Sequence, residues 1–198
     1  MQKVFLLILG VFLYSINVAQ KKDPYVEQIR AYQENYVSTH EVVKKKDKKH
    51  FRFFPVSSAY NISCSFEKIT DTVGFTMNTS ANTLKHYYRY GKLHFNVNGA
   101  HCHLFVYQSK DLMQTEKYRN YLFIPFTDST TGDETYGSGR YLEISIPDIR
   151  DNQLQLDFNK AYNPYCTYAA GYKCPIPPKE NDLPVAIRAG EMNFAKSH

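Results

Sequence analysis

The sequence LHFNVNGAHCHL, residues 93–104, specifies a β-hairpin. At its centre is the pair Asn98-Gly99, and an Asn-Gly pair between alternating runs is typical of a two-residue turn with both residues at positive φ. The turn fixes the register, so Val97 lies opposite Ala100 and the pairing continues outward from there. One face of the hairpin is then apolar and the other polar, which predicts two antiparallel strands with one buried side.

Alternating apolar and polar residues on both sides of the hairpin predict further strands. We expect them at residues 60–66, 73–77, 84–90, 121–126, 140–146, 154–159 and 185–188. Gly91 is expected to end the strand that precedes the hairpin. The chain holds 17 Tyr and 13 Phe among 198 residues, and both types favour strands. The predicted fold class is mainly β: a single antiparallel β-sandwich or a partly open β-barrel, with an N-terminal α-helix.

The first residues have the pattern of a secretory signal. Lys3 precedes ten largely apolar residues at 4–13, a run too short to span a bilayer, and Ala19 offers a small residue for cleavage. Residues 1–19 therefore predict a signal peptide and export to the periplasm or the medium. We expect no integral membrane segment after signal cleavage and no cofactor, and the sequence leaves the oligomeric state open.

Residues 20–50 predict a helix and a basic connector ahead of the β-rich domain at 51–198. Asp23 and Pro24 are typical of a helix start, and apolar spacings of three and four residues continue the helix to residue 37. The charged run that follows predicts a solvated connector. It carries no nucleic-acid motif, and the formal net charge of the chain is only +5, so we expect no nucleic-acid partner.

The four cysteines form two candidate pairs. Cys166 and Cys174 share one Pro-rich loop, and export favours a disulfide between them, with a metal site or a catalytic thiol as alternatives. Cys64 and Cys102 both fall on inward strand faces, so they either form a second disulfide or remain two buried thiols.

The polar face of the hairpin carries three histidines. The register places His94 opposite His103, with His101 diagonal to them. Three imidazoles on one sheet face can bind a transition metal. Because this face is expected to point to solvent, we predict a surface cluster and no metal site, with the metal site as the weaker alternative.

Polar residues of the last third are expected to gather in one pocket. The loop at 128–140 and the segment 157–191 supply them. The candidate ligand-binding residues are Glu134, Tyr136, Arg140, Asp157, Asn159, Asn163, Arg188 and Glu191. The two arginines favour a small polar or anionic ligand, because guanidinium groups bind carboxylates and phosphates through paired hydrogen bonds.

Two other functions stay open for the same residues. Carboxylates in unlike environments can serve as acid and base, so Glu134, Asp157 and Glu191 are the catalytic candidates of a hydrolase. Alternatively, these charged side chains only hold the long loops in place through salt bridges and hydrogen bonds. The domain is then a structural envelope module with no ligand. The leading hypothesis is an exported binding domain, and whether it is an enzyme stays open.

Dense motifs in the second half of the chain resemble a known family. They are YLFIPF at 121–126, Asp128, Gly132, ETY at 134–136, GRY at 139–141, LDFNKAYNP at 156–164, Cys166, CP at 174–175, PP at 177–178, Asn181, LP at 183–184 and IRAGE at 187–191. This pattern resembles the bacterial and archaeal domain-of-unknown-function 1684 family over roughly residues 25–194. The resemblance implies the identity of the domain and the location of its site, and it implies no particular reaction.

Overall fold

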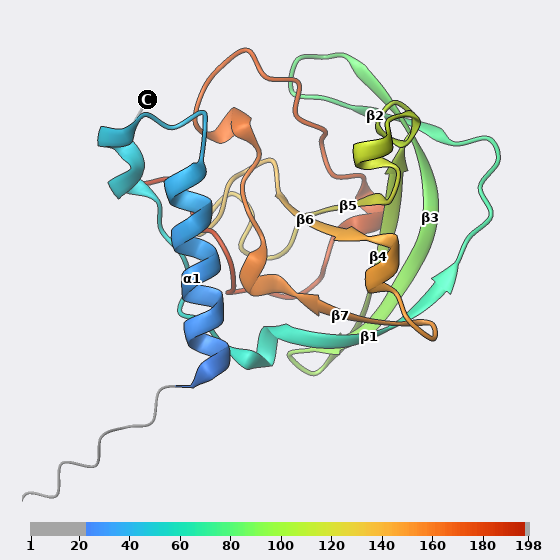
Figure 1. Ribbon diagram of the computed structural model, residues 1–198, viewed down its shortest axis with the longest axis horizontal. Coiled ribbons are helices and arrows are strands. Elements are labelled where there is room, and N and C mark those ends of the chain that lie inside the picture. The colour runs from blue at the N-terminus through green and yellow to red at the C-terminus, as the bar shows by residue number, and fades with distance from the viewer. Residues whose placement is uncertain (1–22, 197–198) are drawn as a thin grey trace, which may run out of the picture.

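The computed structural model describes residues 23–196, so the predicted signal peptide lies outside the described residues (Figure 1). One α-helix precedes seven strands. The elements are α1 (Pro24–Thr39), β1 (Asn61–Lys68), β2 (Phe75–Asn78), β3 (Leu84–Val97), β4 (Ala100–Ser109), β5 (Tyr121–Phe126), β6 (Arg140–Ser145) and β7 (Gln153–Asp157). Within the described part of the chain, no helix is long and apolar enough to cross a membrane.

All seven strands form one antiparallel sheet in the order β6-β5-β4-β3-β1-β7, with β2 added beside β3. Figure 1 shows this sheet curling into a half-barrel, with α1 standing beside it. The mainly β fold is confirmed, and the partly open barrel describes it better than a two-sheet sandwich. The half-barrel stays open because its two end strands, β6 and β7, do not pair with each other among the described residues.

The predicted hairpin is confirmed residue by residue. Val97 pairs with Ala100, and the pairing continues through His94 opposite His103. Asn98 and Gly99 have φ of 50° and 78°, as a two-residue hairpin turn requires. This agreement follows from the turn itself, which allows one register only.

The prediction that Gly91 ends a strand is wrong. Strand β3 runs unbroken through this position, with a shift of register between Arg89 and Gly91. Gly91 is buried under the ring of Phe66, and a Cβ atom here would overlap that ring. The glycine therefore permits a close approach of β1 side chains to the β3 backbone at a bulge, which is a common use of glycine within a strand.

The sheet is packed on both faces. Its larger apolar cluster lies inside the curl and includes Leu93, Leu104, Leu122, Ile124, Phe126, Leu156 and Phe158. A second cluster lies on the other face and consists of Met77, Tyr87, Tyr107, Phe123 and Tyr141. The Pro-rich segment reaches this second cluster, because Tyr141 donates its hydroxyl hydrogen bond to the carbonyl of Pro175.

Helix α1 forms as predicted and joins the domain through polar contacts. Asp23 caps it by accepting a hydrogen bond from the Tyr25 amide, with Pro24 in the first turn. Gln33 is buried and donates to the carbonyl of Asn159 over 3.2 Å. In the basic connector that follows, residues Lys45–His50 form a 3-10 helix with no buried residue.

Two strand predictions near the C-terminus need correction. Strand β7 ends at Asp157, and Phe158–Lys160 form a 3-10 turn that the alternating pattern does not reveal. Residues 185–188 form no strand. The guanidinium group of Arg140 accounts for this, because it binds the carbonyls of Ile187 and Ala189, which a strand would offer to a neighbouring strand.

Candidate functional site

Arg140 ties the loop at 128–140 to the C-terminal segment. Its side chain is fully buried and forms an ion pair with Asp128, with Nη2 and Oδ2 2.7 Å apart. The same guanidinium group donates to the backbone carbonyls of Ile187, Ala189 and Glu191. Arg140 therefore fixes two segments in place. Its Nε has no partner among the described residues, but the side chain is fully buried and so is closed to a ligand.

Glu191 is a buried carboxylate at the centre of a hydrogen-bond cluster. Its Oε1 accepts from the Tyr168 hydroxyl over 2.6 Å. Its Oε2 accepts from the backbone amide of Asn163 over 2.9 Å and from the Tyr36 hydroxyl over 3.3 Å. Burial raises the pKa of Glu191 to about 7, and these hydrogen bonds oppose that rise. The cluster joins α1, the loop after β7 and the C-terminal segment.

Protein partners also engage Glu134, Arg188 and Asp157. Arg188 and Glu134 form an ion pair with 2.8 Å between Nη2 and Oε1, on the surface of the molecule. Tyr136 is half-buried in the same loop. Asp157 accepts the Tyr25 hydroxyl over 3.0 Å, so it fastens the start of α1.

The two predicted asparagines are structural links as well. Asn159 is buried, and its side-chain amide accepts from the Ser57 amide and donates to the Ser57 carbonyl. Asn163 is also buried and donates to the carbonyl of Met192 over 2.8 Å. Both side chains therefore connect segments that are far apart in the sequence.

The eight predicted residues do not come together in any of four cavities that described residues line. None of the four has Glu134, Arg140, Arg188 or Glu191 in its lining. Of the eight, Asp157 alone lines any of these four. Side chains of the loop at 128–140 are instead joined to the C-terminal segment by ion pairs and hydrogen bonds.

A cleft lies instead at the opening of the half-barrel, between the end strands β6 and β7. A first cavity of about 520 Å³ has residues of both strands in its lining, together with Tyr32 of α1. A second cavity of about 780 Å³ lies between α1, β6 and the loop that holds the disulfide. Tyr32, Glu143 and Tyr162 line both cavities, so the two adjoin at these residues.

Glu143 projects from β6 at the junction of the two cavities. Its Oε1 accepts hydrogen bonds from the hydroxyls of Tyr121 and Tyr162, the first over 2.8 Å. Burial, and then the charge of Glu143, raise the pKa of both tyrosines, which keeps them protonated as donors. No donor of the described residues reaches Oε2, and Glu143 is exposed. The carboxylate is thus held in position with one oxygen free.

The second cavity is rich in tyrosine. Its tyrosines are Tyr32, Tyr36, Tyr118, Tyr141, Tyr162, Tyr165 and Tyr172. Rings of this kind offer an apolar face and a polar tip. Such a lining suits a ligand that has both apolar surface and hydrogen-bonding groups.

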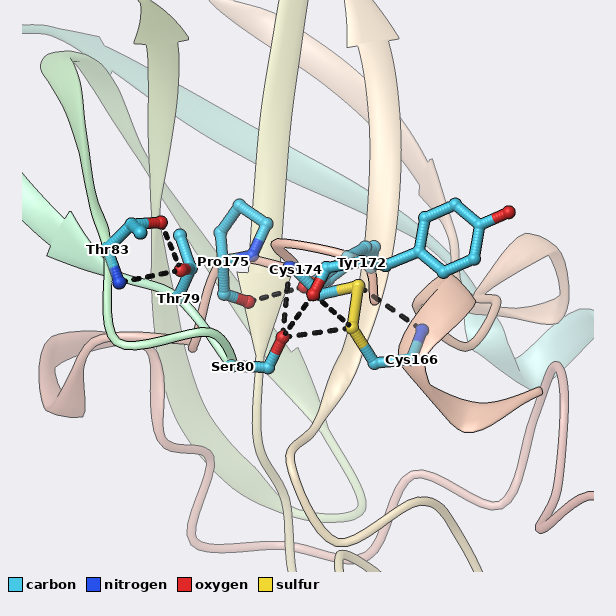
Figure 2. Close-up of a disulfide and its surroundings, with 8 residues drawn as sticks. Thr79, Ser80, Thr83, Cys166, Tyr172, Cys174 and Pro175 are labelled. Carbon is cyan, nitrogen blue, oxygen red and sulfur yellow. Dashed lines mark hydrogen bonds between the residues drawn. A yellow bond between two sulfur atoms is a disulfide. The ribbon is translucent and has the colours of Figure 1, made fainter. Parts of the chain in front are cut away.

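The Cys166–Cys174 disulfide, confirmed here, holds one wall of this cavity (Figure 2). Ser80, beyond the end of β2, fastens the bonded loop. Its Oγ lies 2.9 Å from Cys166 Sγ, accepts from the Cys174 amide over 3.1 Å and donates to the Tyr172 carbonyl. The wall is therefore fixed both covalently and through hydrogen bonds.

Replacing both Cys166 and Cys174 with Ala is expected to lower the free energy of unfolding by roughly 2–3 kcal/mol. The bond closes a loop of sequence separation 8, and the loop-entropy relation gives this magnitude. Denaturant unfolding with and without a reductant measures the effect. Reductant should destabilise the wild type and leave the double variant unchanged. An equal effect of reductant on both proteins would contradict a role for this bond.

The possible second disulfide is not formed. Cys64 and Cys102 are free and buried, which matches the alternative of two buried thiols. Strand β3 separates β1 from β4 in the sheet, so the two residues lie two strand spacings apart, about 9–10 Å. A disulfide needs Cα atoms closer than about 7 Å.

The histidine cluster forms on the polar face of the hairpin. The ring centroid of His94 lies 6.2 Å from that of His101 and 6.5 Å from that of His103. His94 also contacts Glu67, with 3.0 Å between Nε2 and Oε2. Across the part of the chain that the structure describes, no group of three or more His, Cys, Asp or Glu side chains is arranged to hold a metal ion.

Sequence reasoning missed the residues at the cleft junction. Alternation along residues 140–146 places Glu143 on the face opposite Leu142, which is where it lies. What the pattern lacks is the order of the strands. Only the topology shows that β6 is an end strand and that Tyr32 and Tyr162 border the same gap.

The fold and the cleft define a small half-barrel domain whose open side is bordered by a helix and carries a fixed carboxylate. The chain belongs to the family described as "Protein of unknown function (DUF1684)", which it matches over residues 46–192. No curated protein matches it. It is similar to the solution NMR structure of an uncharacterized protein of Haloarcula marismortui. The TM-score is 0.63 and the sequence identity 27%, with coverage of 85% of this chain and 94% of the other.

Proposed function

We propose that this protein is a binding domain that holds a small polar ligand in the cleft at Glu143. The observation that carries the proposal is the state of the Glu143 carboxylate. Two tyrosine hydroxyls orient it through Oε1, while Oε2 has no donor and the side chain is exposed at the junction of two cavities. An oriented carboxylate oxygen in a cleft binds a hydroxyl or amine group of a ligand at little entropic cost.

The cleft favours a ligand with hydrogen-bond donors over an anion. The sequence predicts a polar or anionic ligand because of Arg140 and Arg188, but both side chains form ion pairs, the first with Asp128 and the second with Glu134. At the junction of the cavities the free group is a carboxylate, which repels anions. The ligand group that meets Glu143 is therefore a donor.

The hydrolase alternative finds less support in the geometry. Glu191 accepts three hydrogen bonds in the interior, Glu134 is paired with Arg188, and Asp157 accepts from Tyr25. A general acid or base needs a reachable proton site facing substrate. The hypothesis that these side chains hold the long loops in place describes them well. It is compatible with a ligand site elsewhere, at Glu143.

We also propose that the protein works outside the cytoplasm. The Cys166–Cys174 disulfide supports this, because structural disulfides persist in oxidising compartments. The signal-like pattern of residues 1–19 supports it independently. Recovery of the mature protein from the periplasm or medium, with its N-terminus near residue 20, is the direct test.

A thermal-shift screen tests the binding proposal. The probes are hexoses, N-acetylhexosamines, polyols, amino acids and diamines, with phosphate and citrate as anions. We expect stabilisation by donor-bearing compounds, because ligands that bind only the folded state raise the melting temperature. Glu143→Gln should abolish the shift, since its amide places a donor against the ligand's donor while Oε1 still accepts from both tyrosines.

Glu67→Gln is the matched control, because Glu67 is an exposed carboxylate on β1 that contacts His94 away from the cleft. It should bind like the wild type. Stabilisation by anions alone, or an equal shift in Glu143→Gln, would refute the assignment of the site.

A further inference from the structure

The shape and lining of the cleft point to a class of ligand. We infer that the cleft binds a short neutral carbohydrate chain, with sugar rings in both cavities and one sugar hydroxyl donating to Glu143 Oε2. This inference rests on the proposed function and narrows it from polar ligands in general to oligosaccharides.

The cleft extends over two cavities. Each cavity, of about 520 and 780 Å³, falls in the size range that holds a drug-sized molecule. Both have Tyr32, Glu143 and Tyr162 in their linings, so the carboxylate with the free oxygen lies where the two cavities meet. A single amino acid or amine fills only one side of such a site, whereas a chain of sugars reaches both.

The tyrosine lining of the cleft suits sugar rings. A pyranose ring carries hydroxyls at its rim and C–H groups on its faces, so it needs flat apolar surfaces next to hydrogen-bonding groups. Tyrosine supplies both. Tyr32 is 39% exposed and lines both cavities, and Tyr36 and Tyr162 lie beside each other with ring centroids 6.0 Å apart. Tyr32 and Tyr162 therefore place aromatic rings in the lining of both cavities, next to Glu143.

The charges that line the cleft are of both signs and favour a neutral ligand. The charged residues in the lining are Glu143, Asp148, Asp157, Arg150 and Lys160 in the first cavity, and Glu41, Glu143, Lys85 and Lys173 in the second. A cationic ligand would be repelled by the basic side chains of these linings, and an anionic ligand by the carboxylates. An organic cation is attracted to the faces of aromatic rings. In the second cavity, however, Lys85 and Lys173 would repel it. A neutral ligand with many hydroxyls meets no such repulsion.

Isothermal titration calorimetry with carbohydrates of increasing length tests this inference. The probes are the cello-, chito-, xylo- and malto-oligosaccharides from monosaccharide to pentasaccharide. We expect at least one series to bind, with Kd falling about tenfold or more between monosaccharide and tetrasaccharide as the second cavity fills. Glu143→Gln should raise the Kd of the tetrasaccharide by about tenfold or more, because a hydrogen bond to a charged group is lost.

Two variants of Tyr32 separate stacking from folding. Tyr32→Ala removes the ring and should raise the Kd of the tetrasaccharide by about tenfold, in line with the contribution of stacking on an aromatic ring. Tyr32→Phe keeps the ring and should bind within about twofold of the wild type. Since Tyr32 is partly exposed on α1, both variants should keep the wild-type circular dichroism spectrum and melting temperature.

The outcomes distinguish this inference from the proposed function. If amines or amino acids bind in a Glu143-dependent way and no oligosaccharide does, the binding site stands and the carbohydrate class is overturned. Affinity that does not depend on chain length, or that survives in Tyr32→Ala, also overturns it. If neither oligosaccharides nor the small-molecule panel binds, the proposed function fails together with the inference.

Discussion

Arg140→Met is expected to lower the free energy of unfolding by about 4 kcal/mol, the largest effect of any substitution proposed for this protein. Removing one partner of a buried ion pair typically costs about 3–5 kcal/mol, because the other charge stays buried without compensation. Here Asp128 would be left behind, and the carbonyls of Ile187, Ala189 and Glu191 would lose their donor as well. Guanidinium unfolding followed by circular dichroism measures the loss.

Two further variants give this prediction a control and a coupling test. Arg188→Met removes the exposed partner of Glu134 and should leave the unfolding midpoint essentially unchanged, since surface ion pairs contribute little. The double variant Arg140→Met with Asp128→Asn should lose less stability than the two single changes added together, because the orphaned charge is gone. A small loss, below about 1 kcal/mol, in Arg140→Met would contradict the pinning role.

Glu191→Gln is expected to change how stability depends on pH. Burial raises the pKa of Glu191 from 4.5 to about 7, so the folded protein binds a proton that the unfolded chain releases. The stabilisation that Glu191 contributes is complete below about pH 4.5, and it is lost as the pH rises through about 7. It amounts to roughly 3 kcal/mol, because each pKa unit corresponds to about 1.36 kcal/mol.

The measurement is the difference in unfolding free energy between variant and wild type, taken from pH 4.5 to pH 8. Glutamine is neutral and can donate to the Tyr168 oxygen while accepting from the Asn163 amide, so it resembles the protonated acid. The variant should therefore gain stability relative to wild type as the pH rises. Glu116→Gln, at an exposed position, should show no such trend. If the difference in unfolding free energy between Glu191→Gln and wild type does not change with pH, the raised pKa of Glu191 is contradicted.

Local sequence signals predicted the elements that depend on local chemistry. Asn98-Gly99 determined the hairpin register because the turn requires positive φ at both positions. The Asp23-Pro24 start predicted α1 because capping is a property of adjacent residues. The Cys166–Cys174 bond was predictable because both residues sit in one short loop.

The features that sequence reasoning missed depend on contacts between distant segments. Gly91 suggested a strand end, yet its role is to admit the ring of Phe66 from another strand. Arg140 suggested a ligand contact, yet its partners come from residues 128 and 187–191. Glu143 was placed on the correct face of its strand, but its location in a cleft follows from β6 and β7 being the two end strands of the sheet.

The central claim is that ligands bind at Glu143 in the opening of the half-barrel. Amide chemical-shift mapping by NMR tests it most directly, with a stabilising compound titrated into the uniformly labelled wild-type protein. We predict shifts concentrated in residues 142–144, 154–157 and 160–162, and their loss in Glu143→Gln. Shifts concentrated instead around Glu134 and Arg188, or unchanged in Glu143→Gln, would contradict the account.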